Sequence, residues 1–214
     1  MRTDVAFTSN FDHTWVSDHN EAPRSVAVTN GMTMVLPPER VDRLCSGMNC
    51  HKWGSIEFQA RNTIFGRPTT NDYNCVGSEF NPMQIETVRR TFDIYKKHIR
   101  PYIPESRFFH HTPELVNLKY ASWGVADKPH GTAIMERSSG DGRHGVIGVF
   151  NLADTSASEI RVFPKGIDAA IAYRVTFDNS GVTLSFSGAE LLQNGLRVTL
   201  PGSLSSELII YEAE

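Results

Sequence analysis

The stretch that decides the fold prediction is Phe11-Asp12-His13-Thr14-Trp15-Val16-Ser17-Asp18-His19-Asn20-Glu21. An aromatic and β-branched segment runs directly into a Ser-Asp pair and a polar turn, which is typical of a carboxylate at the carboxyl end of a buried strand. In barrel enzymes, acids and nucleophiles lie at this position because the strand end is rigid and the following loop admits substrate. The stretch therefore predicts a parallel α/β unit with Asp18 at its functional edge.

Strand-like and helical segments alternate over the first half of the chain, as in a parallel α/β array. We expect helices between Ala22 and Met34, from Ser55 to Arg61 and from Pro82 to Arg100, and strands over Val41–Met48 and Thr63–Thr70. The last helix has the clearest signals, because Asn81 can cap it, Pro82 suits its first position and Gln84 completes a capping box. Its predicted core-facing stripe consists of Ile85, Val88, Phe92, Tyr95 and Ile99. The opposite, solvated face carries Arg89, Arg90, Lys96 and Lys97.

The second half of the chain is rich in short β-like runs separated by glycine and asparagine turns. The predicted strands are Thr132–Arg137, Val146–Leu152, Glu159–Phe163, Tyr173–Phe177, Val182–Phe186, Leu196–Leu200 and Glu207–Tyr211. The turn signals are Asp141-Gly142, residues 178–181 and Asn194-Gly195. Closely spaced short strands of this kind favour an antiparallel β-sandwich.

The fold class that follows is α/β plus all-β. Residues 1–105 are predicted to be the C-terminal β/α units of an incomplete TIM barrel, and residues 106–214 an antiparallel β-sandwich domain. Three parallel units cannot close a barrel of eight strands, and their open edges would expose unpaired backbone. We therefore expect residues 1–105 to be the tail of a larger domain.

Composition and charge exclude several kinds of partner. The 214 residues carry a net charge of −3 without a basic block, so nucleic acid is not an expected partner. No apolar run is long enough to span a membrane, and the N-terminus lacks the apolar segment of a signal peptide. Cys45, Cys50 and Cys75 are few and odd in number, which favours a reducing cytoplasm. Cys45, Cys50 and His51 lie close together, but the second ligand pair of a zinc site is missing, so no metal is expected.

The whole chain resembles the C-terminal part of family 36 glycoside hydrolases, the α-galactosidases built from a TIM barrel and a C-terminal β-sandwich. Arg2-x-Asp4 and Trp15-Val16-Ser17-Asp18 are similar to two motifs of the family's barrel, and Arg61–Gly66 with Arg67 to the run into its last strand. Gly188, Leu191, Gly195-Leu196 and Val198 resemble the closing strands of its β-sandwich.

The resemblance implies retaining hydrolysis of an α-galactosidic bond by two carboxyl groups, without metal or organic cofactor. Asp18 matches the family's general acid/base, and Trp15 is expected to wall the sugar pocket or to pack in the core. The family's nucleophile, an aspartate in a Lys-Trp-Asp motif, has no counterpart, because Lys52-Trp53-Gly54 lacks the carboxylate. Thr14 replaces an arginine that binds substrate in some relatives, which leaves the preferred sugar open.

We therefore expect an α-galactoside oligosaccharide as substrate, and a chain that is inactive alone because half of the catalytic pair is missing. An upstream chain that completes the barrel is the expected partner, and a homo-oligomer is left open. Two alternatives also remain open. The chain could be a non-catalytic carbohydrate-binding or structural β-sandwich module, which predicts sugar binding by residues 107–214 alone. It could also be a truncated, non-functional product, which predicts insolubility without a partner.

Overall fold

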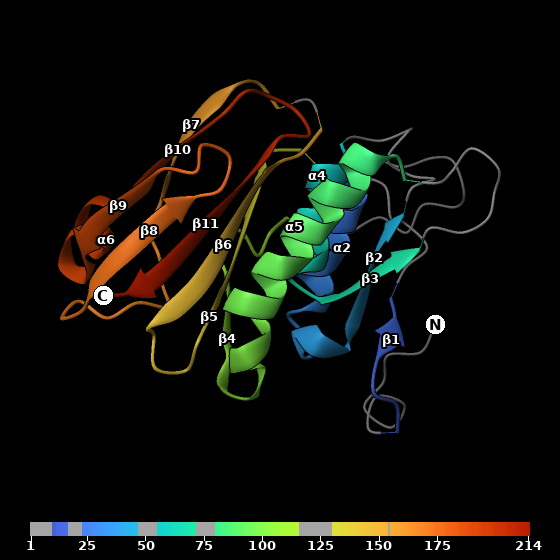
Figure 1. The fold of residues 1–214 in the computed structure, drawn as a ribbon, viewed down its shortest axis with the longest axis horizontal. Helices are drawn as coiled ribbons and strands as arrows, with labels where there is room; N and C mark the ends of the chain where they lie inside the picture. The colour runs from blue at the N-terminus through green and yellow to red at the C-terminus, as the bar shows by residue number, and fades with distance from the viewer. Residues whose placement is uncertain (1–9, 17–22, 47–54, 72–79, 116–129, 154) are drawn as a thin grey trace.

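The computed structural model describes residues 10–16, 23–46, 55–71, 80–115, 130–153 and 155–214. The described residues form a three-stranded parallel sheet and two antiparallel sheets, of six and two strands. Three helices lie between the parallel sheet and the six-stranded sheet, as Figure 1 shows. The structure therefore has the mixed α/β part and the antiparallel β part that the sequence predicts, in the predicted order.

The parallel sheet is small and has three strands in the order β1-β2-β3. Its strands are β1 (Thr14–Trp15), β2 (Val41–Ser46) and β3 (Arg67–Asn71). The helices are α2 (Arg24–Met32), α4 (Ile56–Thr63) and α5 (Pro82–His98), with short 3₁₀ turns η1 (Pro38–Arg40) and η2 (Arg100–Glu105). Both strand pairs are parallel, so each connection between strands crosses over through a helix.

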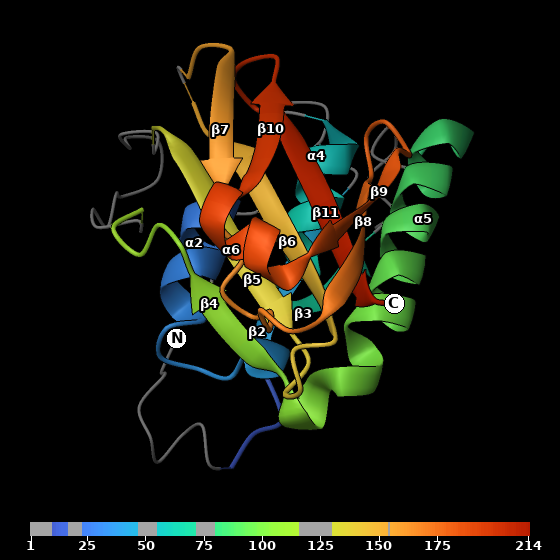
Figure 2. The same cartoon turned by 90° about the vertical axis from the view of Figure 1, so that its left-hand side faces the viewer.

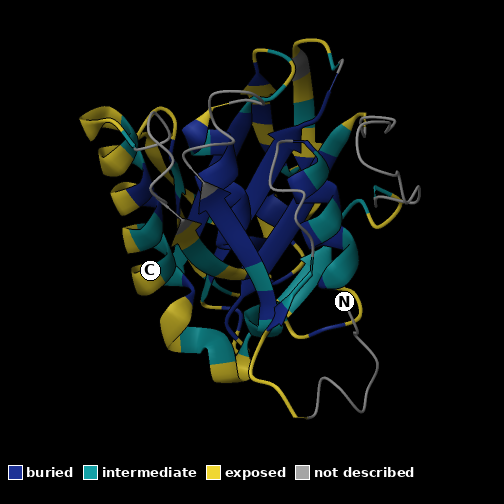
Figure 3. Ribbon diagram, turned by 90° about the vertical axis from the view of Figure 1, so that its right-hand side faces the viewer, coloured by how far each residue is buried: buried dark blue, intermediate teal, exposed yellow. Residues whose placement is uncertain are grey.

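Helix α5 begins as predicted. The Asn81 side chain accepts a hydrogen bond from the Gln84 backbone N–H, the Gln84 side chain accepts one from the Asn81 backbone, and Pro82 is the first helical residue. The predicted stripe is correct except at Ile85, which is 51% exposed. Ile85 points roughly 50° away from the mean direction of the other four stripe residues, because successive helical residues turn by about 100°. The outer face of α5 is exposed, as the yellow colour in Figure 3 shows.

The predicted strand Thr63–Thr70 is wrong in its first half. Thr63 is the last residue of α4, and the chain turns through Ile64 and Phe65 before β3 begins at Arg67. Both apolar side chains are fully buried in the core against the antiparallel sheet. Their burial, rather than strand pairing, explains the apolar run that predicted a strand.

The antiparallel sheet contains six strands in the order β4-β5-β6-β11-β8-β9. These are β4 (Arg107–His110), β5 (Thr132–Ser138), β6 (His144–Asn151), β8 (Ala172–Phe177), β9 (Thr183–Ser187) and β11 (Ser206–Ala213). A second, two-stranded layer of β7 (Ser158–Val162) and β10 (Leu196–Leu200) packs over it with helix α6 (Gly188–Asn194), facing the viewer in Figure 2. All seven predicted strands form, whereas β4 and α6 were not predicted.

Helix α6 corrects the expected strand character of Gly188 and Leu191, which are both helical. The Ser187 side chain accepts from the Glu190 backbone, and the Glu190 side chain accepts from the Ser187 backbone, so a capping box starts the helix. Leu191 still enters the sandwich core, from the helix instead of from a strand. Leu196 and Val198 do lie in a strand, with Arg197 and Thr199 exposed between the buried residues.

The central strands of the six-stranded sheet, β5, β6 and β11, are buried on both faces. One face meets α2, α4 and the turn after α4 through Met135, Phe150 and Leu208, whereas the other meets β7, β10 and α6 through Ile147, Val149 and Ile209. Burial on both sides explains why residues 146–150 and 208–210 are continuous apolar runs rather than alternating ones. The two halves of the chain therefore share one core.

A buried ion-pair cluster also joins the two halves. The Arg61 guanidinium on α4 contacts the Asp178 carboxylate in the β8–β9 turn and donates to the Ser206 carbonyl at 2.8 Å. Arg90 on α5 donates to the Asp178 carbonyl at 2.8 Å and pairs with its carboxylate. Because Arg61 is only 1% exposed, this carboxylate offsets a charge that would otherwise be costly to bury.

Candidate active site

The candidate active site begins at the parallel sheet, where β1 carries Trp15. Trp15 lies directly beside Asp42 of β2, and Asp42 lies beside Arg67 of β3. Trp15 is partly buried. The two neighbouring strands therefore bring an aromatic ring and a carboxylate together, although 27 positions separate these residues in the sequence.

The two faces of this sheet differ in what covers them. Arg43 and Cys45 of β2 point toward the helices, because Arg43 donates to Ser25 on α2 at 2.6 Å and Cys45 packs against Ile56 and Ala60 of α4. Successive strand residues alternate between faces, so Asp42 lies on the opposite face.

On that opposite face no described helix covers the sheet (Figure 1). Thr69 of β3 donates its hydroxyl to the Asp42 carboxylate at 2.9 Å. Register places Trp15 on the same face as Asp42. The uncovered face thus presents an aromatic side chain and a hydrogen-bonded carboxylate, which are groups suited to binding a sugar. No local sequence pattern singles out Asp42, because its proximity to Trp15 depends on the parallel register of β1 and β2.

Arg67 differs from Trp15 and Asp42, its neighbours across the sheet. It is the first residue of β3, at the amino edge of the sheet, and its side chain lines a hollow beside α5 instead.

Asp18, the predicted acid/base, lies outside the described residues. The same is true of Arg2, Asp4, and Lys52-Trp53-Gly54. In the sequence, Asp18 follows the last residue of β1 by three positions. Its role therefore stays a prediction, as does the role of Trp15 in binding substrate.

Other candidate residues have structural surroundings. His110 Nδ1 lies 2.9 Å from the Asn30 side-chain oxygen, whereas His111 Nε2 lies 2.8 Å from the Glu136 carboxylate, so the adjacent histidines do not converge. Cys45 is fully buried and unbridged. Among the residues that the structure describes, no group of three or more His, Cys, Asp or Glu side chains could hold a metal ion.

Several residues that carry the family resemblance hold the fold together. Arg61 joins α4 to the antiparallel sheet, as described above. A Cβ at Gly66 would lie 2.6 Å from the Val41 carbonyl oxygen, and one at Gly188 would lie 1.9 Å from the Asp168 carbonyl oxygen. Both contacts are too close for any side chain, so glycine is required where two segments approach each other. These residues support the fold match rather than the chemistry.

The described fold is shared with a C-terminal part of family 36 α-galactosidases. The resemblance inferred from the sequence is therefore confirmed at the level of the fold. The sequence matches no protein-family model and no curated protein. Among the described residues, no helix combines the length and apolar character needed to cross a membrane.

Three solved structures illustrate the match. A variant of the family 36 α-galactosidase AgaA from Geobacillus stearothermophilus, in complex with stachyose, is 18% identical with a TM-score of 0.70. AgaB from the same organism and the α-galactosidase from Lactobacillus brevis are each 16% identical with a TM-score of 0.71. In each case 94% of this chain is covered but only 26% of the other chain, so the chain spans about a quarter of these proteins.

Proposed function

We propose that this chain is the C-terminal segment of a retaining glycoside hydrolase that acts on α-galactosides. In this proposal, residues 1–105 are the last β/α units of a TIM barrel and residues 106–214 its C-terminal β-sandwich. The observation that carries the proposal is the three-stranded parallel sheet, with Trp15 at the end of β1 and two positions before the Ser17-Asp18 pair in the sequence, in a fold shared with α-galactosidases.

Asp18 acts as the general acid/base. A retaining glycosidase needs one carboxyl group to protonate the departing oxygen and later to activate water, while a second attacks the anomeric carbon from about 5–5.5 Å away. The first group needs a raised pKa so that it holds a proton near neutral pH, and an apolar wall such as Trp15 supplies that effect. Trp15 also packs against the apolar C–H face of the sugar.

The nucleophile comes from outside these 214 residues, because no Lys-Trp-Asp motif occurs among them. In the part of the chain that the structure describes, β1 and β3 each pair on one side only. A polypeptide that adds parallel strands at these edges would enclose the uncovered face and bring the second carboxylate. The chain alone is inactive, because it has neither the covalent route nor a walled pocket.

The test begins with an aryl α-galactoside and the purified chain, for which we expect no turnover. The chain is then expressed with the polypeptide encoded immediately upstream, in which we expect a Lys-Trp-Asp strand. Activity should appear, and Asp18→Ala should lower it by at least about 10²-fold, the usual contribution of a general acid or base. The matched control is Asp12→Ala, another carboxylate of the same stretch, which should leave turnover unchanged.

Azide addition sharpens the assignment of Asp18. In an Asp18→Ala enzyme, azide can replace the water that no longer has a general base, and the galactosyl azide should keep the α configuration. An inverted product would assign Asp18 as the nucleophile instead. Turnover by the isolated chain, or full activity of the Asp18→Ala pair, contradicts the proposal.

A further inference from the structure

The hollow beside α5 that Arg67 lines is at the amino edge of the parallel sheet, where β2 and β3 begin. Its volume is about 370 Å³, and it is lined by residues from η1, β3, α5 and η2: Glu39, Arg67, Phe92, Tyr95, Lys96 and Arg100, with Pro68. The volume is within the range of about 300–1,000 Å³ that small-molecule sites occupy. The predicted catalytic residue follows the carboxyl end of β1, so this hollow lies at the other edge of the sheet.

The hollow has an excess of positive charge. Arg67, Lys96 and Arg100 contribute three cations against the single carboxylate of Glu39. Lys96 pairs with Asp93 at 3.3 Å, outside the hollow, whereas Arg67 and Arg100 form no ion pair with any residue that the structure describes. Two guanidinium groups are therefore open to an anion.

A buried arginine reaches the wall of the same hollow. Arg137 of β5 is 2% exposed, and its Nη2 lies 3.3 Å from the Glu39 carboxylate and 3.3 Å from the Ser106 hydroxyl. Its Nε and Nη1 atoms have no hydrogen-bond partner in the described part of the chain. Arg137 does not line the hollow itself, but its buried positive charge lies beside the Glu39 carboxylate that does, and Glu39 partly offsets it.

Tyr95 lies among these charges. Burial raises the pKa of the Tyr95 hydroxyl, and the positive charges of Arg137, Arg100 and Arg67 act against that rise. The phenol is thus an electrostatic neighbour of all three arginines, and it remains a neutral donor at physiological pH. A planar guanidinium fork and a phenolic O–H are well suited to bind the oxygens of a phosphate group.

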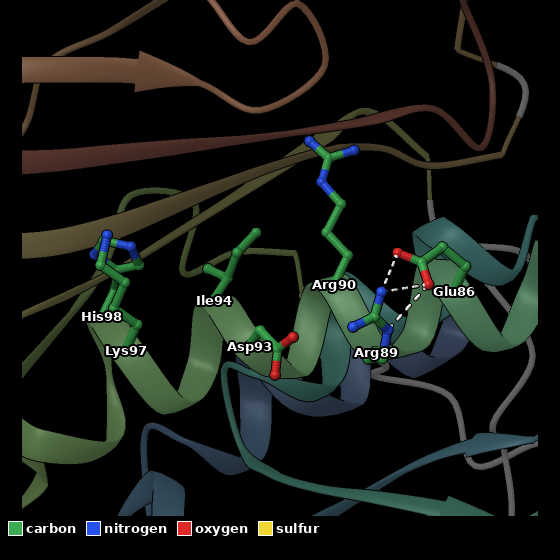
Figure 4. Close-up of a pocket in the computed structure, with 7 residues that line it drawn as sticks. All are labelled: Glu86, Arg89, Arg90, Asp93, Ile94, Lys97 and His98. Carbon is green, nitrogen blue, oxygen red and sulfur yellow. Dashed lines mark hydrogen bonds and ion pairs between the residues drawn. The ribbon is translucent and has the colours of Figure 1, made fainter.

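The hollow on the other side of α5 provides a contrast. It has Arg89, Arg90, Lys97 and His98 in its wall (Figure 4), but its arginines already have anionic partners. Arg89 donates to Glu86 at 2.7 Å, and Arg90 pairs with Asp178. Of these two hollows among the described residues, the one at η1 has arginines without an ion pair, Arg67 of β3 and Arg100 of η2, whereas the arginines of the other already have anionic partners.

We propose that the hollow between η1, β3, α5 and η2 binds a phosphate group, with Arg67 and Arg100 as its main ligands and Tyr95 as a donor. The phosphate is either free or the end of a small phosphorylated molecule, for which Phe92 offers an apolar surface. This site is independent of the proposed hydrolase activity, because it uses none of the residues assigned to that reaction.

The test measures binding of inorganic phosphate and of glucose 6-phosphate to the full chain by calorimetry, with potassium chloride at matched ionic strength. We expect saturable binding of at least one phosphate compound and none of chloride. Arg67→Gln and Arg100→Gln should each weaken the affinity about tenfold or more, the usual effect of losing a charged hydrogen bond. Both residues are exposed, so these variants should fold.

Arg89→Gln is the matched control, because it removes an exposed arginine of α5 that lies outside the hollow. It should leave the affinity unchanged. If glucose 6-phosphate binds more tightly than inorganic phosphate, the ligand is a phosphorylated small molecule. If the two bind with equal affinity, the ligand is free phosphate. Absence of saturable binding, or an equal loss of affinity in Arg89→Gln and Arg67→Gln, overturns the proposal.

Discussion

The parallel sheet and the six-stranded antiparallel sheet differ in how completely their faces are covered by other elements. The central strands of the six-stranded antiparallel sheet are covered on both faces, whereas the described helices cover the parallel sheet on one face only. The antiparallel sheet also supplies much of the cover for those helices. We infer that packing against the second half of the chain stabilises the helices of the first half. The uncovered face of the parallel sheet is then available for a binding partner.

The largest expected effect comes from separating the halves. Residues 106–214 expressed alone lose the cover over Met135, Phe150 and Leu208, so a large apolar face becomes exposed. We expect this fragment to aggregate or to bind a hydrophobic dye strongly. Gel filtration and dye fluorescence measure the outcome. A soluble, cooperatively folding monomer would show that the sandwich is independent, and would revive the carbohydrate-binding alternative if it also binds sugar.

The next effect concerns the buried link between the halves. Arg61→Met removes one of the two arginines that hold Asp178, and it leaves the Ser206 carbonyl with the Asn179 side chain as its remaining donor. We expect a loss of about 3 kcal/mol in the free energy of unfolding, as for other broken buried ion pairs. Urea unfolding followed by circular dichroism and by tryptophan fluorescence should show one shared transition.

The control for this link is Arg89→Ala, which breaks the exposed pair with Glu86. It should cost less than about 1 kcal/mol, because solvent screens exposed ion pairs. If Arg61→Met costs no more than this control, the buried cluster does not couple the two halves.

A smaller effect is expected within the antiparallel half. The fully buried Glu136 carboxylate accepts from Tyr211 at 2.9 Å, from the Lys165 and Gly166 backbone at 2.8 Å, and contacts His111. Tyr211→Phe removes one of these donors and should cost about 1.5–3 kcal/mol, the range for hydrogen bonds to charged groups. Tyr173→Phe is the comparison variant, because its hydroxyl contacts only neutral backbone groups and should cost less.

The smallest expected effect is a pH dependence of the stability that comes from His98 and His110. Burial lowers the pKa of His98 and of His110, so the folded state favours their neutral forms. Stability from these groups is therefore present above the ordinary histidine pKa near 6.5 and is lost as pH falls below it. The melting temperature should drop between pH 7.5 and pH 5. In His110→Asn, which keeps a donor toward Asn30 but cannot titrate, the drop should be shallower; an unchanged slope would remove His110 from this account.

How far the sequence predicts this structure depends on how local each signal is. The capping box at Asn81 and Gln84 and the turn at Asp141-Gly142 are formed by neighbouring residues, so α5 and the β5–β6 hairpin are predicted correctly. Strand β4 was missed because its pairing with β5 joins segments about 25 residues apart and its own pattern does not alternate. Helix α6 also has a local signal, the capping box formed by Ser187 and Glu190.

The candidate site shows the same limit more strongly. Trp15 was singled out from its own neighbourhood, whereas its proximity to Asp42 requires the parallel register of β1 and β2. The two arginines that line the proposed phosphate-binding hollow come from β3 and η2, and no spacing rule brings them together. Chemistry assembled from distant segments becomes visible only when the packing is known.

The central position of β6 and β11 has a consequence for the motions of the molecule. Each is hydrogen-bonded to strands on both sides and has an apolar layer above and below, so its amide hydrogens meet solvent only when the whole domain opens. Exchange with deuterium at Ile147 or Ile209 should then run on the timescale of global unfolding. At the outer edge of β9, by contrast, exchange needs only local fraying. Amide hydrogens there should therefore exchange faster than those in the central strands of the same sheet.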